Sequence, residues 1–182
     1  MDEVARHCNI SKKTIYQYFN DKDALVKEIM ERHIEQDRCV IQNLHDQASS
    51  ALDEVVKISE YLKTEIAGIH PSVLYDLRKY HSSAYEVFEN HRDNHFLGLV
   101  TRNLERGVKE GVYRSEINIG IYARLRILQL EALFDGKLFP KTEWEQTSVQ
   151  LYFIDHFVRG LATEEGLKQW LNISQNPFKV IR

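Results

Sequence analysis

The chain has 182 residues, which is room for one compact domain or for a small module joined to a larger one. It is 43% hydrophobic and 28% charged, with eight glycines and three prolines, and this composition excludes a disordered or collagen-like chain. The formal net charge of −3 argues against a protein coated in nucleic acid, although a small basic patch is compatible with that average.

Neither a membrane nor an oxidising compartment is indicated. No apolar run approaches the roughly 18 residues of a membrane span, and we expect no secretory leader. Cys8 and Cys39 are too few and too isolated for a disulfide framework or a cysteine-rich zinc site. We therefore expect a cytoplasmic protein without a cofactor.

Helical periodicity runs along most of the chain and strand-like alternation is nearly absent, so the sequence predicts an all-α fold. The expected helices cover residues 2–7, 11–19, 21–45, 50–68, 71–81, 84–109, 118–134, 142–161 and 164–172. Ser11, Asp21 and either Ser49 or Ser50 are predicted N-caps. Gly111 is a predicted left-handed helix stop.

Residues 4–19 predict a helix, a tight turn and a second helix. Ala5 is small enough for the second helix to cross closely above it, and Asn9 tolerates the left-handed backbone of a tight turn. The apolar side chains expected to point inward are Ile10, Ile15 and Phe19. Polar residues then face outward at the start of the second helix, as in a DNA recognition helix. The alternative is an ordinary helical hairpin.

The outward residues have the chemistry that DNA requires. Lys12 and Lys13 offer two ammonium groups to phosphate. The hydroxyls of Tyr16 and Tyr18 can donate hydrogen bonds to phosphate, and Gln17 can address a base edge.

Residues 11–25, SKKTIYQYFNDKDAL, resemble the signature of the TetR family of transcriptional regulators, and residues 1–6 resemble the family's second helix. After residue 25 the resemblance lies in the layout, including the turn at residues 107–117. The resemblance implies a helix-turn-helix DNA-binding head over residues 1–24. It also implies a larger helical domain over residues 25–182 that binds an effector and dimerises.

The resemblance further implies a set of DNA-facing residues. These are Lys12, Lys13, Thr14, Tyr16, Gln17, Tyr18 and Lys22. Lys12, Tyr16, Tyr18 and Lys22 would bind phosphate, while Lys13, Thr14 and Gln17 would lie nearest the bases.

Three departures from the family pattern matter for the head. Asn9 and Lys13 stand where the family often has glycine. Family members also carry a helix ahead of the position of Met1, and we expect a head without it to expose Val4, Ile15 and Phe19. A truncated sequence and a start assigned to an internal methionine would both explain this, and the sequence does not separate them.

Residues 71–106 mix aromatic and imidazole groups in a way that suits a cavity for an amphipathic small molecule. The resemblance places the effector pocket among residues 50–135, which overlaps this run. The candidate pocket residues are Tyr75, Tyr80, Phe88, His91, His95 and Phe96. The alternative for the aromatic stripe is an ordinary core.

Two further features have plain structural interpretations. His91 and His95 have the i, i+4 spacing at which two imidazoles can share a metal, but no metal site is predicted, and we expect a solvated or pocket-lining role. Cys8 could be a redox sensor, but we expect a semi-buried structural thiol.

Apolar stripes on the two helices at 118–134 and 142–161 predict a dimer interface. The candidate residues are Ile121, Leu125, Leu128 and Ala132 on the first helix, and Leu151, Ile154, Val158 and Leu161 on the second. Two such helices from each protomer would form a four-helix bundle about a two-fold axis. The alternative is that the stripes face only the protomer's own core.

The sequence therefore predicts a homodimeric transcriptional regulator, most simply a repressor, that leaves a palindromic operator when a small-molecule effector binds. It does not separate repressor from activator. The alternative is a helical ligand-binding or scaffold protein that has lost DNA binding. An enzyme is not expected, because no nucleophile–base pair, phosphate-binding glycine loop or convincing metal cluster is recognisable.

Overall fold

The protein was analysed as a computed structural model that describes residues 1–70 and 72–173. These residues form helices and connecting loops, and within them the sole strand-like pairing is one isolated bridge between Tyr113 and Ala162. The predicted all-α fold is confirmed. None of the described helices combines the length and the apolarity that crossing a membrane requires.

The helices follow the predicted order closely. They are α1 (Asp2–His7), α2 (Lys12–Tyr18), α3 (Lys22–Asp46), α4 (Ala51–Gly68), α5 (Val73–Tyr80), α6 (Ser82–Asn90), the π-helical η1 (His91–Phe96), α7 (Leu97–Lys109), α8 (Ile119–Ala132), α9 (Gln146–Leu161) and α10 (Glu164–Asn172). The single helix expected over residues 84–109 is interrupted by η1. The helix expected from residue 142 begins at Gln146, and the predicted start at Pro71 lies outside the described residues.

Local hydrogen bonds explain why the N-terminal helices begin where they do. The side chain of Ser11 accepts from the backbone N–H of Thr14 at 3.0 Å, and Asp21 accepts from Ala24 at 2.8 Å. Ser50, rather than Ser49, caps α4. Asn9 has the left-handed φ of 54° that the turn needs, and Gly111 ends α7 with a φ of 74°.

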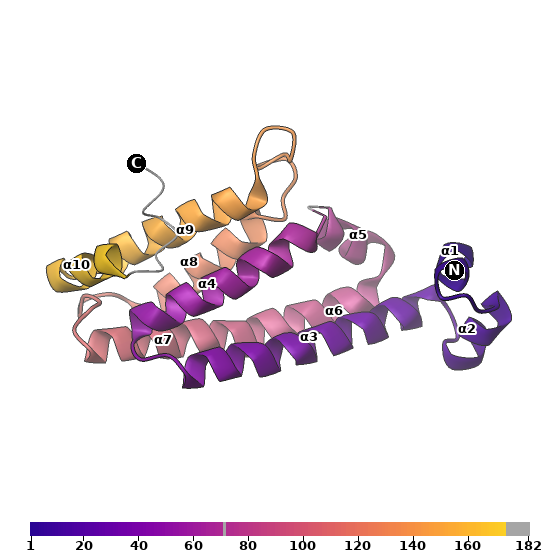
Figure 1. Cartoon of the computed structure of the whole chain (residues 1–182), viewed down its shortest axis with the longest axis horizontal. Coiled ribbons are helices and arrows are strands. Elements are labelled where there is room, and N and C mark those ends of the chain that lie inside the picture. Colours follow the sequence, from indigo (N-terminus) through magenta and orange to yellow (C-terminus); the bar gives the residue numbers. More distant parts are fainter. Residues whose placement is uncertain (71, 174–182) are drawn as a thin grey trace.

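The helices form an elongated body with the head at one end (Figure 1). α1 and α2 lie beyond the first turn of α3, away from the other helices. α3 packs along α6 and also against α4, while α4 packs on α7 and α9. The long α3 thus carries the head at its N-terminal end and packs against the body along its length.

The main core lies at the end of the body far from the head. Its fully buried members include Leu52, Leu104, Tyr113, Val158 and Trp170. Glycines allow this end to close tightly. A Cβ at Gly107 would lie 2.0 Å from the ring of Tyr113, and one at Gly166 would lie 2.0 Å from the carbonyl oxygen of Val112.

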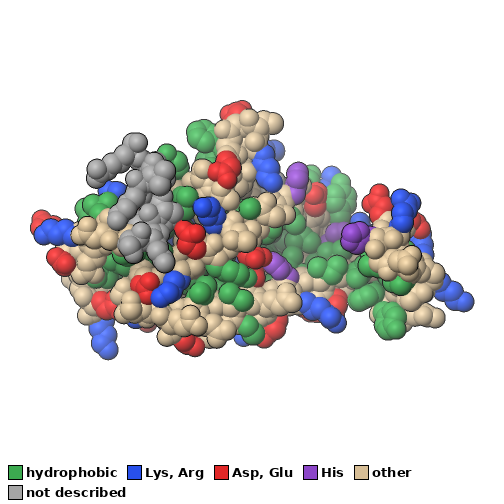
Figure 2. All heavy atoms as spheres, in the orientation of Figure 1, with side chains coloured by type: hydrophobic (Ala, Val, Ile, Leu, Met, Phe, Trp, Pro, Cys, Tyr) green, Lys and Arg blue, Asp and Glu red, His purple; other side chains and the backbone are tan. Residues whose placement is uncertain are grey.

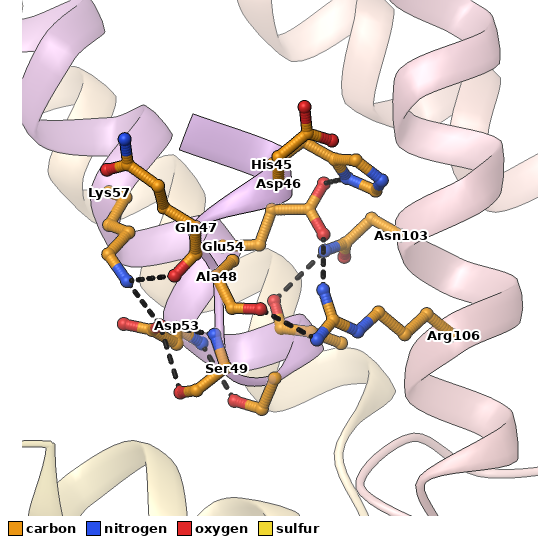
Figure 3. A network of polar contacts seen from close by, with 12 residues as sticks. His45, Asp46, Gln47, Ala48, Ser49, Asp53, Glu54, Lys57, Asn103 and Arg106 are labelled. Atoms are coloured by element: carbon orange, nitrogen blue, oxygen red, sulfur yellow. Dashed lines mark hydrogen bonds and ion pairs between the residues drawn. The ribbon is translucent and has the colours of Figure 1, made fainter. Parts of the chain in front are cut away.

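A charged network fixes the far end of α3 to the body (Figure 3). The carboxylate of Glu54, which is 1% exposed, lies 2.9 Å from Nδ1 of His45 and 3.5 Å from Nη1 of Arg106. Arg106 also donates to the carbonyl of Ala48 at 2.9 Å and to Glu110 at 2.7 Å. The loop between α3 and α4 is thereby tied to α7.

Replacing Glu54 with Gln should lower the free energy of unfolding. The loss should be about 3 kcal/mol, because the change leaves the charge of Arg106 without its buried partner while partial exposure lets water compensate some of the cost. Urea denaturation measures this loss. Glu60→Gln on the exposed face of α4 is the matched control and should change stability by less than about 0.5 kcal/mol. Equal losses in both variants would contradict the anchoring role.

Candidate functional site

The head is a small pair of helices with few buried side chains. Ala5 and Ile15 are 6% and 4% exposed and form the contact between α1 and α2. Val4 is 40% exposed, as expected, but the expected exposure of Ile15 is wrong, and Phe19 is only half-buried. The expectation that Ile10 is core is wrong, because it is 45% exposed: two short helices cover too little area to enclose a third apolar side chain.

The predicted DNA-facing residues lie together on α2 and the first turn of α3. Exposed side chains among them are those of Lys12, Lys13, Tyr16, Gln17, Tyr18 and Lys22. Tyr18 is the most open of the aromatic residues there, at 78% exposed. This surface offers ammonium, phenol and amide donors, which suit phosphate oxygens and base edges.

Two members of the set already have partners within the head. Nζ of Lys12 lies 3.0 Å from a carboxylate oxygen of Asp2, and this pairing raises the pKa of Lys12. The hydroxyl of Thr14 lies 2.7 Å from that of Ser11 at the start of α2. Lys12 must therefore share or break its ion pair to bind phosphate, and Thr14 also supports the helix cap.

Cys8 does not fit the expected semi-buried position. Its side chain is exposed at the C-cap of α1.

Asp23, in the first turn of α3, connects the head end of this helix to the junction between α5 and α6. One carboxylate oxygen lies 3.1 Å from Nδ1 of His81, and the other accepts from the hydroxyl of Ser83 at 2.5 Å. The bond from Ser83, followed by that from His81, holds the pKa of Asp23 below its usual range. The charged form of Asp23 thus ties the base of the head to the body.

A cavity of about 270 Å³ opens within the body between α3, α4, α5 and α8. Of the predicted pocket residues, Phe88, His91 and Phe96 line it. The π-helical turn η1 carries two of these, His91 and Phe96. Such turns are frequent at functional sites. Figure 2 shows hydrophobic and histidine side chains together in a recess on this side of the body.

The other predicted pocket residues lie elsewhere. Tyr75 faces a separate surface groove, and Tyr80 is 61% exposed beneath the ammonium group of Lys79. The ring of His95 stacks on that of His91 at 5.1 Å, but His95 itself does not line the cavity. None of these three residues lies on the cavity wall, which corrects the prediction, and the two tyrosines of α5 are 60% and 61% exposed.

Sequence reasoning missed most of the cavity wall. Apolar side chains of α3, α4 and α8 supply it, among them Met30, Ile34, Leu62, Ile66 and Leu130. These residues belong to ordinary amphipathic stripes, so their sequence pattern is the same whether they face a core or a cavity.

The stretch of wall contributed by α3 and α4 is also acidic. Ligand atoms of His33, Asp37 and Glu65 lie within 4.8 Å of one another, and the hydroxyl of Tyr61 donates to Asp37. Within the described part of the chain, neither carboxylate pairs with a lysine or arginine. His33 and Asp37 share an i, i+4 spacing that sequence could have flagged, whereas Glu65 comes from another helix.

His91 should make the protein lose stability in mild acid. Burial, followed by the nearby His95, lowers the pKa of His91 from 6.5 to about 4. The unfolded chain therefore takes up a proton before the folded one does, so stability present above pH 6.5 falls as the pH drops toward 4.

Replacement of His91 by Gln should therefore reduce the loss of unfolding free energy between pH 6.5 and pH 4, as measured by urea denaturation at several pH values. His7→Gln, at an exposed position on α1, is the control and should leave the pH profile unchanged. If the unfolding free energy of His91→Gln depended on pH as that of the wild type does, the contribution of His91 to the acid sensitivity would be contradicted.

An apolar groove lies between α8 and α9 on the outer surface. Ile121, Leu125 and Leu128 are 57%, 45% and 57% exposed, as an interface would require. Leu125, Leu128 and Ala132 line the groove together with Phe153 and other residues of α9.

The α9 half of the predicted interface is not at this surface. Ile154, Val158 and Leu161 are 1%, 0% and 0% exposed and belong to the protomer's core, and Leu151 packs partly buried against it. The assignment of these α9 residues to the dimer interface is therefore wrong. Both faces of α9 carry apolar residues, and the predicted stripe is the face that packs against α4.

Comparison with known proteins gives consistent matches. Residues 1–29 match the family described as "Bacterial regulatory proteins, tetR family". The chain is 20% identical over 166 residues, 91% of its length and 86% of the relative's, to the "Uncharacterized HTH-type transcriptional regulator YvaF" of Bacillus subtilis strain 168.

Solved structures share the fold at low sequence identity. A TetR-family regulator from Agrobacterium tumefaciens is similar with a TM-score of 0.72 and 15% identity, covering 89% of this chain and 86% of that one. The regulator FadR from Bacillus subtilis, in complex with stearoyl-CoA, has a TM-score of 0.65 and 12% identity, with 87% of each chain covered. The predicted fold, a helix-turn-helix head on a helical body, is thereby confirmed.

Proposed function

We propose that this chain, a transcriptional regulator of the TetR family, is a dimeric repressor that a small molecule releases from a palindromic operator. The observation that carries the proposal is the position of α2. Its polar face is exposed at the end of a long helix, beyond the rest of the body (Figure 1). A recognition helix must protrude in this way to enter a major groove.

In this proposal residues 1–24 are the DNA-binding unit, and residues 25–182 bind the effector and dimerise. Lys12, Tyr16, Tyr18 and Lys22 contact phosphates. Lys13, Thr14 and Gln17 lie nearest the base edges. Residues 1–24 carry no net charge, so binding would depend on the local ammonium groups of Lys12, Lys13 and Lys22 rather than on an overall positive field.

The exposed groove of α8 and α9 is the proposed dimer interface. Burial of Ile121, Leu125 and Leu128 against their copies would remove three large apolar side chains from water. A two-fold axis there would present two recognition helices to two half-sites, which requires a separation of about 34 Å along the DNA.

The cavity of about 270 Å³ is the proposed effector site. α3 supplies part of its wall, and the same helix carries the head. α5 supplies another part, and the junction between α5 and α6 binds Asp23 through His81 and Ser83. An effector that prefers one arrangement of these helices would change the separation of the heads by its differential affinity. The stearoyl-CoA complex of FadR supports binding of a small molecule by this fold.

The alternative function is a helical ligand-binding protein that has lost DNA binding. The exposure of the apolar side chains Val4 and Ile10 in the head favours it. An enzymatic function has no such observation in its favour.

Two variants of the head should affect DNA binding differently. Lys22→Ala removes a phosphate contact, so it should weaken binding on every sequence and reduce the slope of log K against log salt by roughly one. Gln17→Ala removes a base contact, so it should cost about 1–3 kcal/mol on the preferred operator and relax sequence preference. Fluorescence anisotropy with DNA from upstream of the protein's own gene, and with unrelated DNA, measures both effects.

Lys109→Ala, at the distant end of α7, is the matched control and should bind as the wild type does. Weak wild-type binding that is equal on all DNA and unchanged in either head variant would reject the repressor and favour the ligand-binding alternative.

Charge placed in the groove should separate the dimer. Leu128→Glu puts a carboxylate at the centre of the proposed interface, and its burial against a second copy is unfavourable. Sedimentation velocity should therefore show monomers where the wild type is dimeric. Leu138→Glu, equally exposed in the loop before α9, should remain a dimer. A dimeric Leu128→Glu variant would place the interface elsewhere.

A further inference from the structure

A second, smaller cavity, here called the deep cavity, adjoins the proposed effector site and lies farther from the head. It has a volume of about 70 Å³, which is room for more than one water-sized group. Ile41, Leu62 and Phe96 line both cavities, so the two adjoin along the interior of the helical body. The deep cavity is walled mainly by apolar side chains of α4, α7 and α9.

Arg126, from α8, places a cationic side chain in that wall. It is 8% exposed, its Nη1 donates to Gln129 at 3.3 Å, and its guanidinium lies 5.9 Å from the ring centre of Phe157. No carboxylate of the described residues is within ion-pair distance of it. Burial lowers the pKa of Arg126 to about 10, so it still carries its charge at neutral pH. Its bond to Gln129 engages one of its five N–H donors, and no other acceptor for it is recorded among the described residues.

The neighbouring polar groups of the deep cavity are either committed or free to donate. Glu54 also lines the cavity, but its two oxygens are engaged by His45 and Arg106. The side-chain amide of Asn103 donates a hydrogen bond to the carbonyl oxygen of Ala51. The hydroxyl of Ser59, by contrast, is buried without a partner among the described residues.

This combination is costly in an empty protein. A buried guanidinium without an anion loses its hydration and regains little, so an apolar residue of similar size would generally give equal or greater stability. An anion that enters the cavity would supply the missing partner through short, charge-assisted hydrogen bonds.

We propose that Arg126 and Ser59 bind the carboxylate of an amphipathic acid whose apolar part lies in the adjoining effector cavity. This inference rests on the proposed effector site and names the chemistry of its ligand. The apolar side chains at the junction suit the chain that follows the carboxylate. In the effector cavity, Asp37 and Glu65 would repel a carboxylate. Arg92 of the same wall is already paired with Asp93 and Glu131. Both features favour the orientation with the head group in the deep cavity.

Three ten-carbon probes that differ only in their head group test the proposal: decanoate, 1-decanol and decylamine. Isothermal titration calorimetry on the wild-type protein should show decanoate binding at least roughly tenfold more tightly than the alcohol or the amine, as expected for hydrogen bonds to a charged group. Equal affinity for all three, or a preference for decylamine, would overturn the proposal.

Variants of Arg126 separate a ligand role from a structural one. Arg126→Met should abolish the preference for decanoate over decanol, while the unliganded variant should be as stable as the wild type or more so. Arg124→Met, on the exposed side of the same helix, is the matched control and should keep the preference. A preference that survives in Arg126→Met would reject the site.

If Arg126→Met is itself destabilised, Ser59→Ala carries the test. This variant should bind decanoate more weakly than the wild type does and should bind decanol equally well. If Ser59→Ala binds each probe with the wild-type affinity, the site is rejected. DNA binding of the unliganded proteins is a separate readout. It should be the same in wild type and Arg126→Met, so loss of the ligand site and failure of the repressor proposal are distinguishable.

Discussion

The attachment of α3 at both of its ends is the constraint on which the rest of the structure depends. A helix of 25 residues is about 37 Å long, so a small tilt at its fixed end moves the head appreciably. The buried carboxylate of Glu54 fixes the far end through His45 and Arg106. Asp23 fixes the near end through His81 and Ser83. Between these two points α3 forms a wall of the proposed effector cavity, which is where a ligand would act on it.

The interior between these anchors is not packed for maximal stability. It contains two adjoining cavities and a buried arginine without a counter-ion among the described residues. A core built only to be stable would fill such space with apolar side chains. The firm packing lies instead around Trp170 and Tyr113, away from the head. One end of the body is thus closely packed, and the other contains the space of the proposed effector site.

Much of the head could be predicted from sequence because its geometry is local. Ser11 and Asp21 cap helices three residues away, and Asn9 supplies its own left-handed turn. The DNA-facing side of α2 follows directly from helical periodicity, although its contacts with DNA remain a prediction. Ile10 was assigned to the core wrongly, because the area available to cover it depends on how much other structure surrounds the turn.

The sequence by itself determined that the chain is helical, where most helices begin, and which family it resembles, because these depend on side chains a few residues apart. Only the tertiary structure decided which apolar stripe faces a partner, the core or a cavity, because these three surroundings demand the same periodicity. The tertiary structure buries Ile154 and Val158 in the core, whereas their pattern had predicted an interface, and it exposes Tyr80, which had been predicted to line the pocket. It also brought Ser59 and Arg126, 67 residues apart in the chain, to one cavity wall, since that proximity depends on how α4 and α8 are arranged in space.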